Sequence, residues 1–122
     1  MTEKDMAMAF LKLAAAGRVD EAYDLYVGEN FRHHNPYFAG NAQALKDGMR
    51  ENALKHPDKT FEVQRAIAEG TLVAVHSHVQ MPSSKVTIAV VHIFRFEGGK
   101  IVELWDVGQA VPDGAVNELG MF

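Results

Sequence analysis

The second half of the chain alternates between residue types with a period of two, and this constrains the fold more than any other feature. The alternation starts at Phe61, and Gly- and Pro-containing turns divide residues 61–111 into four segments. Long strands at this spacing favour a curved antiparallel sheet in which each strand pairs with the next. We predict strands from Phe61 to the turn at Glu69-Gly70, from Leu72 to Met81, from Val86 to Phe96 and from Ile101 to Val111.

The first half has helical spacing instead. Thr2 can cap a first helix that ends at Gly17, and Asp20 can cap a short second helix that runs through Glu21 to Val27. Asn41 can cap a third helix that Pro57 closes, after an irregular stretch. Three helices before one antiparallel sheet predict a single α+β domain over residues 1–122, with the helices packed on one face.

Composition excludes several classes of function. The net charge of -4 argues against a nucleic-acid-binding surface, and the absence of cysteine excludes disulfides and thiolate chemistry. No apolar stretch reaches membrane-spanning length, and the first residues are charged where a signal peptide is apolar. We therefore expect a cytoplasmic protein that contacts neither membrane nor nucleic acid.

One histidine and one aspartate stand out on the last predicted hairpin. If Gly99 takes the left-handed position of a bulged three-residue turn, His92 pairs with Leu104 and shares a face with Asp106. A two-residue turn would put the two groups on opposite faces. An imidazole and a carboxylate on an apolar face suit acid–base chemistry, whereas the alternatives are a structural hydrogen bond or no contact. The other members of the predicted face are apolar: Val90, Phe94, Phe96, Val102 and Leu104.

Other histidines are candidates with competing interpretations. In His33-His34-Asn35-Pro36, the proline forces an extended chain, so only one of the two histidines can face a pocket. The alternative is a surface loop with an Asx turn at Asn35.

His76 and His78 share a strand face and could bind a metal ion with His92 as third ligand. The alternative is that they simply line a cavity or a sheet face.

The opposite face of the hairpin mixes apolar and charged residues. Because an uncovered sheet face with a large aromatic residue often forms an interface, we expect a homodimer through this surface; the alternative is core beneath the C-terminal tail. The residues that we expect on this face are Trp105, Val91, Ile93, Arg95, Ile101, Glu103 and Val107.

Several segments, in the same order along the chain, resemble the SnoaL-like branch of the NTF2-like superfamily. They are F-R-H-H-N-P, E-G-T-L-V-A-V-H-S-H-V, V-H-I-F-R-F-E-G-G-K-I-V-E-L-W-D-V-G-Q and N-E-L-G-M-F. The resemblance implies a cone-shaped α+β barrel around one deep pocket, and a homodimer. Polyketide cyclases of this family close rings by aldol condensation without metal or organic cofactor. Their acid–base aspartate matches Asp106, a pocket histidine matches His92, and a pocket loop matches His34-Asn35, whereas Leu104 replaces a histidine of many relatives.

The residues and the resemblance together predict a cofactor-independent acid–base enzyme on a small carbonyl or polyketide-like substrate. The reaction would be an aldol condensation, a cyclisation or an isomerisation, with no metal. The alternative is a small-ligand-binding protein without catalysis, and less favoured is a histidine metal site. The predicted catalytic residues are Asp106, His92 and His34, and the predicted substrate-binding residues are Asn35, His76, His78, Phe94 and Leu104.

Overall fold

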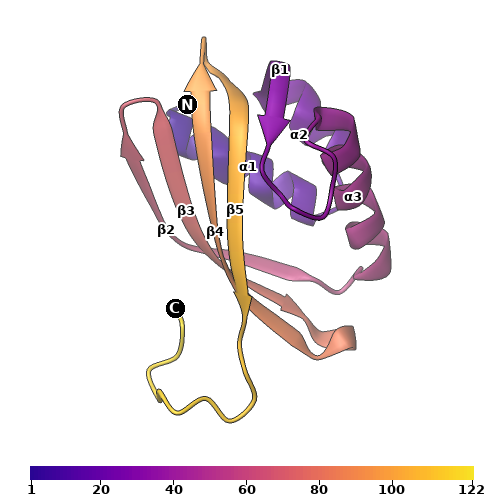
Figure 1. The fold of residues 1–122 in the computed structure, drawn as a ribbon, viewed down its shortest axis with the longest axis vertical. Helices are drawn as coiled ribbons and strands as arrows, with labels where there is room; N and C mark the ends of the chain where they lie inside the picture. The colour runs from indigo at the N-terminus through magenta and orange to yellow at the C-terminus, as the bar shows by residue number, and fades with distance from the viewer.

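The computed structural model describes residues 1–122 and has three helices packed against one curved five-stranded sheet (Figure 1). The strands lie in the order β1-β5-β4-β3-β2. The helices are α1 (Glu3–Ala15), α2 (Val19–Tyr26) and α3 (Ala42–Lys55). The strands are β1 (Val27–His33), β2 (Thr60–Glu69), β3 (Leu72–Met81), β4 (Val86–Glu97) and β5 (Lys100–Ala110), with a short 3₁₀ turn, Pro82–Ser84, between β3 and β4.

Local capping signals place two of the three helices where they were predicted. The Thr2 hydroxyl accepts a hydrogen bond from the Asp5 backbone N–H at 3.1 Å, and the Asp5 carboxylate accepts one from the Thr2 N–H at 3.0 Å. The Asn41 side chain caps α3 by accepting from the Ala44 N–H at 2.9 Å. The predicted cap at Asp20 is wrong, because α2 starts at Val19 and the Asp20 carboxylate pairs with lysine and arginine side chains of α3.

The sheet is mixed and not purely antiparallel as predicted. Strands β2 to β5 are antiparallel neighbours, but β1 pairs in parallel with β5, matching His33 with Leu104. Strand β1 was not predicted, because Gly28 and Asn30, the latter at φ 59°, interrupt its alternation. The partner strand also lies far away in the chain, so no local pattern marks the pairing.

The hairpin of β4 and β5 differs from the predicted register in two ways that cancel. Gly98 and Gly99 both have positive φ, 58° and 77°, and form a two-residue turn between paired Glu97 and Lys100. A bulge at Val102 then shifts the pairing by one residue, since Arg95 pairs with Glu103 whereas Phe96 pairs with Ile101. The shift returns the residues of β5 beyond the bulge to the faces that were predicted for them. His92 therefore pairs directly with Asp106 and not with Leu104. The prediction that His92 and Asp106 share a face is confirmed.

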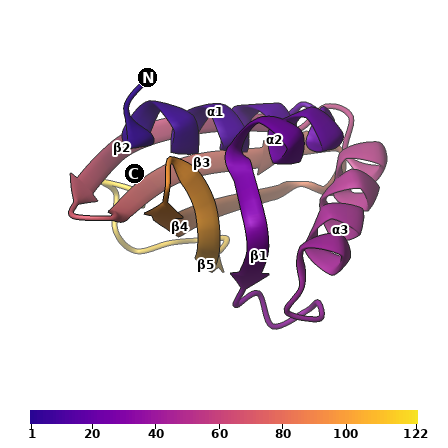
Figure 2. The ribbon, with the colours of Figure 1, turned by 90° about the horizontal axis from the view of Figure 1, so that it is seen from above.

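The main core lies between the concave face of the sheet and helices α1 and α2 (Figure 2). Phe10 is fully buried and its ring makes edge contacts with Tyr23 and Phe94, at 5.4 and 5.9 Å between ring centres. Ile101, which was predicted for the opposite face, takes a buried core position that was assigned to Val102.

The C-terminal segment after β5 passes along the side of the sheet opposite α1 (Figure 2). Its last residue, Phe122, stacks on His78 with ring centres 3.8 Å apart. Part of the convex face is therefore covered by the chain itself. None of the three helices is long and apolar enough to cross a membrane.

Candidate active site

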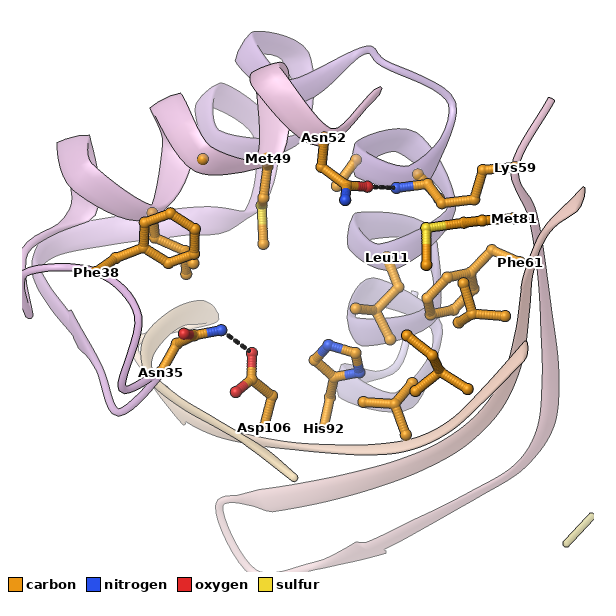
Figure 3. A pocket seen from close by; sticks show the side chains of 17 residues that line it. Leu11, Asn35, Phe38, Met49, Asn52, Lys59, Phe61, Met81, His92 and Asp106 are labelled. Atoms are coloured by element: carbon orange, nitrogen blue, oxygen red, sulfur yellow. Dashed lines mark hydrogen bonds between the residues drawn. The ribbon is translucent and has the colours of Figure 1, made fainter. Parts of the chain in front are cut away.

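A cavity of about 290 Å³ lies between α1, α3 and the concave face of the sheet (Figure 3). Eleven of its 17 lining residues are hydrophobic. Five lining residues carry polar or charged side chains: Asn35, Asn52, Lys59, His92 and Asp106. A concave, mostly apolar cavity with few polar groups is typical of a small-molecule site.

His92 and Asp106 lie side by side on this cavity, on paired positions of β4 and β5. The His92 side chain is 8% exposed and its ring lies 6.2 Å from each of the rings of Phe61 and Phe94. Burial lowers the pKa of His92 to about 4, although the Asp106 charge acts in the opposite direction. The imidazole is therefore neutral at pH 7. Its Nδ1 is buried and has no hydrogen-bond partner.

Asn35 connects the loop after β1 to the carboxylate. Its Nδ2 donates a hydrogen bond to Asp106 Oδ2 at 3.0 Å, and its Oδ1 accepts one from the Tyr37 N–H at 2.9 Å. The second bond forms the Asx turn that was considered as an alternative to a pocket role. Asn35 thus combines both interpretations: the turn holds the side chain so that its amide meets Asp106.

His33, and not His34, lies on the inner side of β1. His33 is 5% exposed; its Nδ1 accepts from the Asn35 N–H at 3.1 Å, and its Nε2 is 2.5 Å from the Ala39 carbonyl oxygen. These contacts fit a neutral ring protonated on Nε2, and they hold both ends of the Asn35 loop. His33 was not among the site residues predicted from the sequence.

His34 lies on the convex face, away from the cavity. Its ring stacks on Trp105 with centres 5.0 Å apart and 5° between planes, and its Nε2 lies 2.7 Å from Glu103 Oε2. The expectation that His34 faces the pocket is therefore wrong. Successive strand residues point to opposite faces, and His33 occupies the inner one.

His76 and His78 also lie on the convex face. Both rings stack on Phe122, and the Arg65 guanidinium bonds His76 Nδ1, while Ser77 between them is fully buried on the inner side. His92 is on the concave face, so the three imidazoles cannot share a metal ion, and no other group of three histidine or acidic side chains has metal-site geometry. The two histidines do not reach the cavity as substrate-binding residues either.

Phe94 and Leu104 were also predicted to bind substrate. They are 0% and 1% exposed and belong to the main core under α1 and α2, not to the cavity wall. The apolar wall comes instead from residues such as Leu11, Met49 and Phe61 (Figure 3).

The cavity contains a second polar pair, which was not predicted from the sequence. Lys59 Nζ donates to Asn52 Oδ1 at 2.6 Å, and burial lowers the pKa of Lys59. Figure 3 shows this pair across the cavity from Asn35 and Asp106. No periodicity signals it, because Lys59 lies in the turn between α3 and β2 and reaches the cavity only through tertiary packing.

Gly48 shapes the wall of the cavity within α3. A Cβ atom there would lie 2.5 Å from Cε1 and Cζ of Phe38, so the missing side chain makes room for that ring. Glycine is a poor helix former, so its position inside α3 calls for a structural reason. Its packing role explains why a poor helix former stands there.

On the convex face, a charged cluster ties β1, β4 and β5 together around Glu103. Arg32 Nε and Arg95 Nε donate to its two carboxylate oxygens at 2.9 and 3.0 Å, and the side chain is 6% exposed. Hydrogen bonds from Arg32, then His34, lower the pKa of Glu103 to about 2. The cluster is separated from the cavity by the sheet, which indicates a structural role.

Comparison with known proteins agrees with this architecture. A family model described as SnoaL-like domain matches residues 7–104, a range that ends two residues before Asp106. No curated protein matches the chain.

Solved structures of similar fold share about one residue in five with the chain. A SnoaL-like polyketide cyclase from Agrobacterium tumefaciens has a TM-score of 0.72 at 21% identity, over 89% of this chain and 92% of the other. An NTF2-like protein of unknown function from Cytophaga hutchinsonii has a TM-score of 0.70 at 20% identity, over 89% and 91%. A cystatin-fold protein from Novosphingobium aromaticivorans has a TM-score of 0.74 at 22% identity, over 88% and 98%.

Proposed function

The chain belongs to the SnoaL-like domain family, and we propose that it is a cofactor-independent acid–base enzyme acting on a small carbonyl compound. The observation that carries the proposal is the pairing of His92 with Asp106 on the wall of a mostly apolar cavity. Asn35 adds a hydrogen bond that orients the carboxylate. Titratable groups in such a cavity are candidates for proton transfer.

Asp106 is the proposed proton carrier. The Asn35 amide donates a hydrogen bond to Oδ2 of Asp106, whereas Oδ1 of Asp106 has no partner in the protein. One carboxylate oxygen is therefore held in place, and the other is available to a substrate. In the proposed step the carboxylate takes a proton from the carbon next to a carbonyl group. The C–H bond breaks, and its electron pair moves to the carbonyl oxygen to form an enolate.

His92 is the proposed hydrogen-bond donor to that oxygen. A buried N–H without a partner is more costly than a buried lone pair, so the orphan Nδ1 favours the tautomer with the proton on Nε2. Figure 3 shows one ring nitrogen of His92 directed into the cavity. Because the ring is neutral at pH 7, it donates a hydrogen bond to the enolate and does not supply a full proton.

The enolate is the shared intermediate of the candidate reactions. Attack on a second carbonyl group gives an aldol condensation or cyclisation, and the new alkoxide takes a proton from Asp106. Return of the proton to a different carbon gives an isomerisation. The name of the Agrobacterium neighbour, a SnoaL-like polyketide cyclase, supports the first outcome, while the cavity of about 290 Å³ favours small substrates.

We further propose a homodimer through the convex face. Val107 is 72% exposed there, and Val91, Ile93 and Trp105 are only partly covered by the chain itself. A second copy would bury this apolar surface.

Deuterium exchange tests the proposed function. The purified protein is incubated in D₂O with small β-dicarbonyl compounds and enolisable aldehydes, and loss of the α-proton signal is followed by NMR. Asp106→Asn should slow exchange by roughly 10²–10⁴-fold, because the amide keeps the shape but cannot take the proton. Asp113→Asn, an exposed carboxylate in the C-terminal segment, is the control and should exchange as wild type does.

The two main alternatives give different results. Wild-type protein that binds but exchanges none of these compounds would support a binding protein without catalysis. Exchange that persists in Asp106→Asn would remove Asp106 as the base.

A further inference from the structure

We propose that Lys59 and Asn52 hold a carboxylate of the substrate, which makes the substrate class a small oxo acid. Its enolisable carbon would lie at Asp106, on the other side of the cavity. This inference rests on the proposed function for the position of the reacting carbon.

The cavity has opposite charges on its two sides. Of the lining residues, Lys59 is the one cation, and Asp106 is the one carboxylate. Figure 3 shows the Asn52–Lys59 pair and the Asn35–Asp106 pair facing each other across apolar side chains. A ligand that is anionic at one end and uncharged at the other matches this distribution, since Asp106 would repel a second anion.

Lys59 and Asn52 also offer unused donors at one place. One N–H of the Lys59 ammonium bonds Asn52 Oδ1, which leaves two, and Asn52 Nδ2 has no partner in the protein. Together these N–H groups suit the two oxygens of a carboxylate. The other polar side chains that line the cavity lie on the side of Asp106. Lys59 and Asn52 are therefore the polar groups that a ligand meets at the opposite end.

The lysine charge is not balanced within the protein. Lys59 makes no ion pair, whereas neighbouring Lys55 pairs with Glu51 at 3.3 Å on the outer surface of α3. Lys59 is partly buried, and burial lowers its pKa because nothing of opposite charge compensates. Asn52 lies in the last turn of α3, and the C-terminal end of a helix carries partial negative charge, which does not attract an anion. The attraction for an anion at this end of the cavity therefore comes from Lys59. A bound carboxylate would supply the missing partner.

The test compares levulinate with its methyl ester by calorimetric or NMR titration at pH 7. Both have the same ketone and carbon chain, and only the acid carries a charge. Wild type should bind levulinate about 10–100-fold more tightly than methyl levulinate, the range expected for hydrogen bonds to a charged group. Lys59→Met should reduce this ratio to about one, and Lys59→Gln serves as a second variant if the first is unstable. Lys55→Met is the matched control and should keep the wild-type ratio.

Several outcomes would overturn the inference. These are equal binding of acid and ester by wild type, no binding of the acid at millimolar concentration, and a preference for the acid that survives in both Lys59 variants. Failure of the proposed function has a different signature. In that case wild type prefers the acid, and Lys59→Met loses the preference, but levulinate exchanges no α-proton, or Asp106→Asn exchanges it as fast as wild type.

Discussion

Burial of a neutral His92 should make the protein less stable as pH falls from about 6.5 to 4. The unfolded chain binds a proton on this ring near pH 6.5, whereas the folded protein binds it only near pH 4. Between these values the unfolded state holds more protons, so acid favours unfolding. This contribution to stability is complete above the pKa of the ring in the unfolded chain, 6.5. It is lost as pH falls to the pKa of the ring in the folded protein, about 4.

The size of the effect depends on the two pKa values. One pKa unit corresponds to about 1.36 kcal/mol, so a change from 6.5 to about 4 corresponds to about 3 kcal/mol in total. About 2 kcal/mol of this should be lost between pH 6.5 and 4.5. Three carboxylates with lowered pKa, Asp5, Asp20 and Glu103, have ordinary values of 3.8 to 4.5, so their contributions are lost at lower pH.

Urea unfolding followed by circular dichroism at pH 6.5, 5.5 and 4.5 measures the effect. His92→Phe, which keeps a buried ring without a titrating group, should remove most of this pH dependence. His78→Gln, which changes an imidazole on the convex face, should keep it. Two results would refute this role of His92: a wild-type free energy of unfolding that is constant across this range, or a His92→Phe variant that retains the wild-type pH dependence.

Three further predictions concern other parts of the molecule. Glu103→Gln should cost about 2 kcal/mol in urea unfolding at pH 7, because it leaves the Arg32 and Arg95 charges beside a neutral group, and a cost below about 0.5 kcal/mol would contradict this. Gly48→Ala should leave stability unchanged or raised by up to about 1 kcal/mol while a crystal structure shows the Phe38 ring displaced from the cavity; a ring in its original place would be inconsistent. Light scattering at tens of micromolar should report a dimer that Val107→Lys converts to monomer, and a monomeric wild type would refute the interface.

The parts of the fold that depend on neighbouring residues could be predicted from the sequence. Thr2 and Asn41 cap helices through bonds to residues three positions away, so their role can be read from local spacing. The shared face of His92 and Asp106 was also predicted correctly, but for an incorrect register. The turn is one residue shorter than expected, and the bulge at Val102 compensates for it.

The histidine assignments show where local reasoning fails. The resemblance assigned His34 to the pocket, and the local pattern could not show which of His33 and His34 points inward. That choice depends on the parallel pairing of β1 with a distant strand. For His76 and His78 a usable signal was present. Val73, Val75, Val79 and Met81 are the apolar set of β3, and Ser77 lies in phase with them, which puts both histidines outside. Lys59 carried no such signal, because its position at the cavity depends on how α3 packs over the sheet.

The most direct test of the central claim is the stereochemistry of proton removal. A ketone with a methylene group beside its carbonyl, such as butanone, is incubated with the protein in D₂O and stopped after a small fraction has exchanged. A single base held on one wall of the cavity should remove only one of the two methylene protons. We predict that wild type gives one enantiomer of the monodeuterated product in large excess, and that this product disappears with Asp106→Asn. Equal deuterium at both positions, or the same excess from Asp106→Asn, would contradict the assignment of Asp106 as the base.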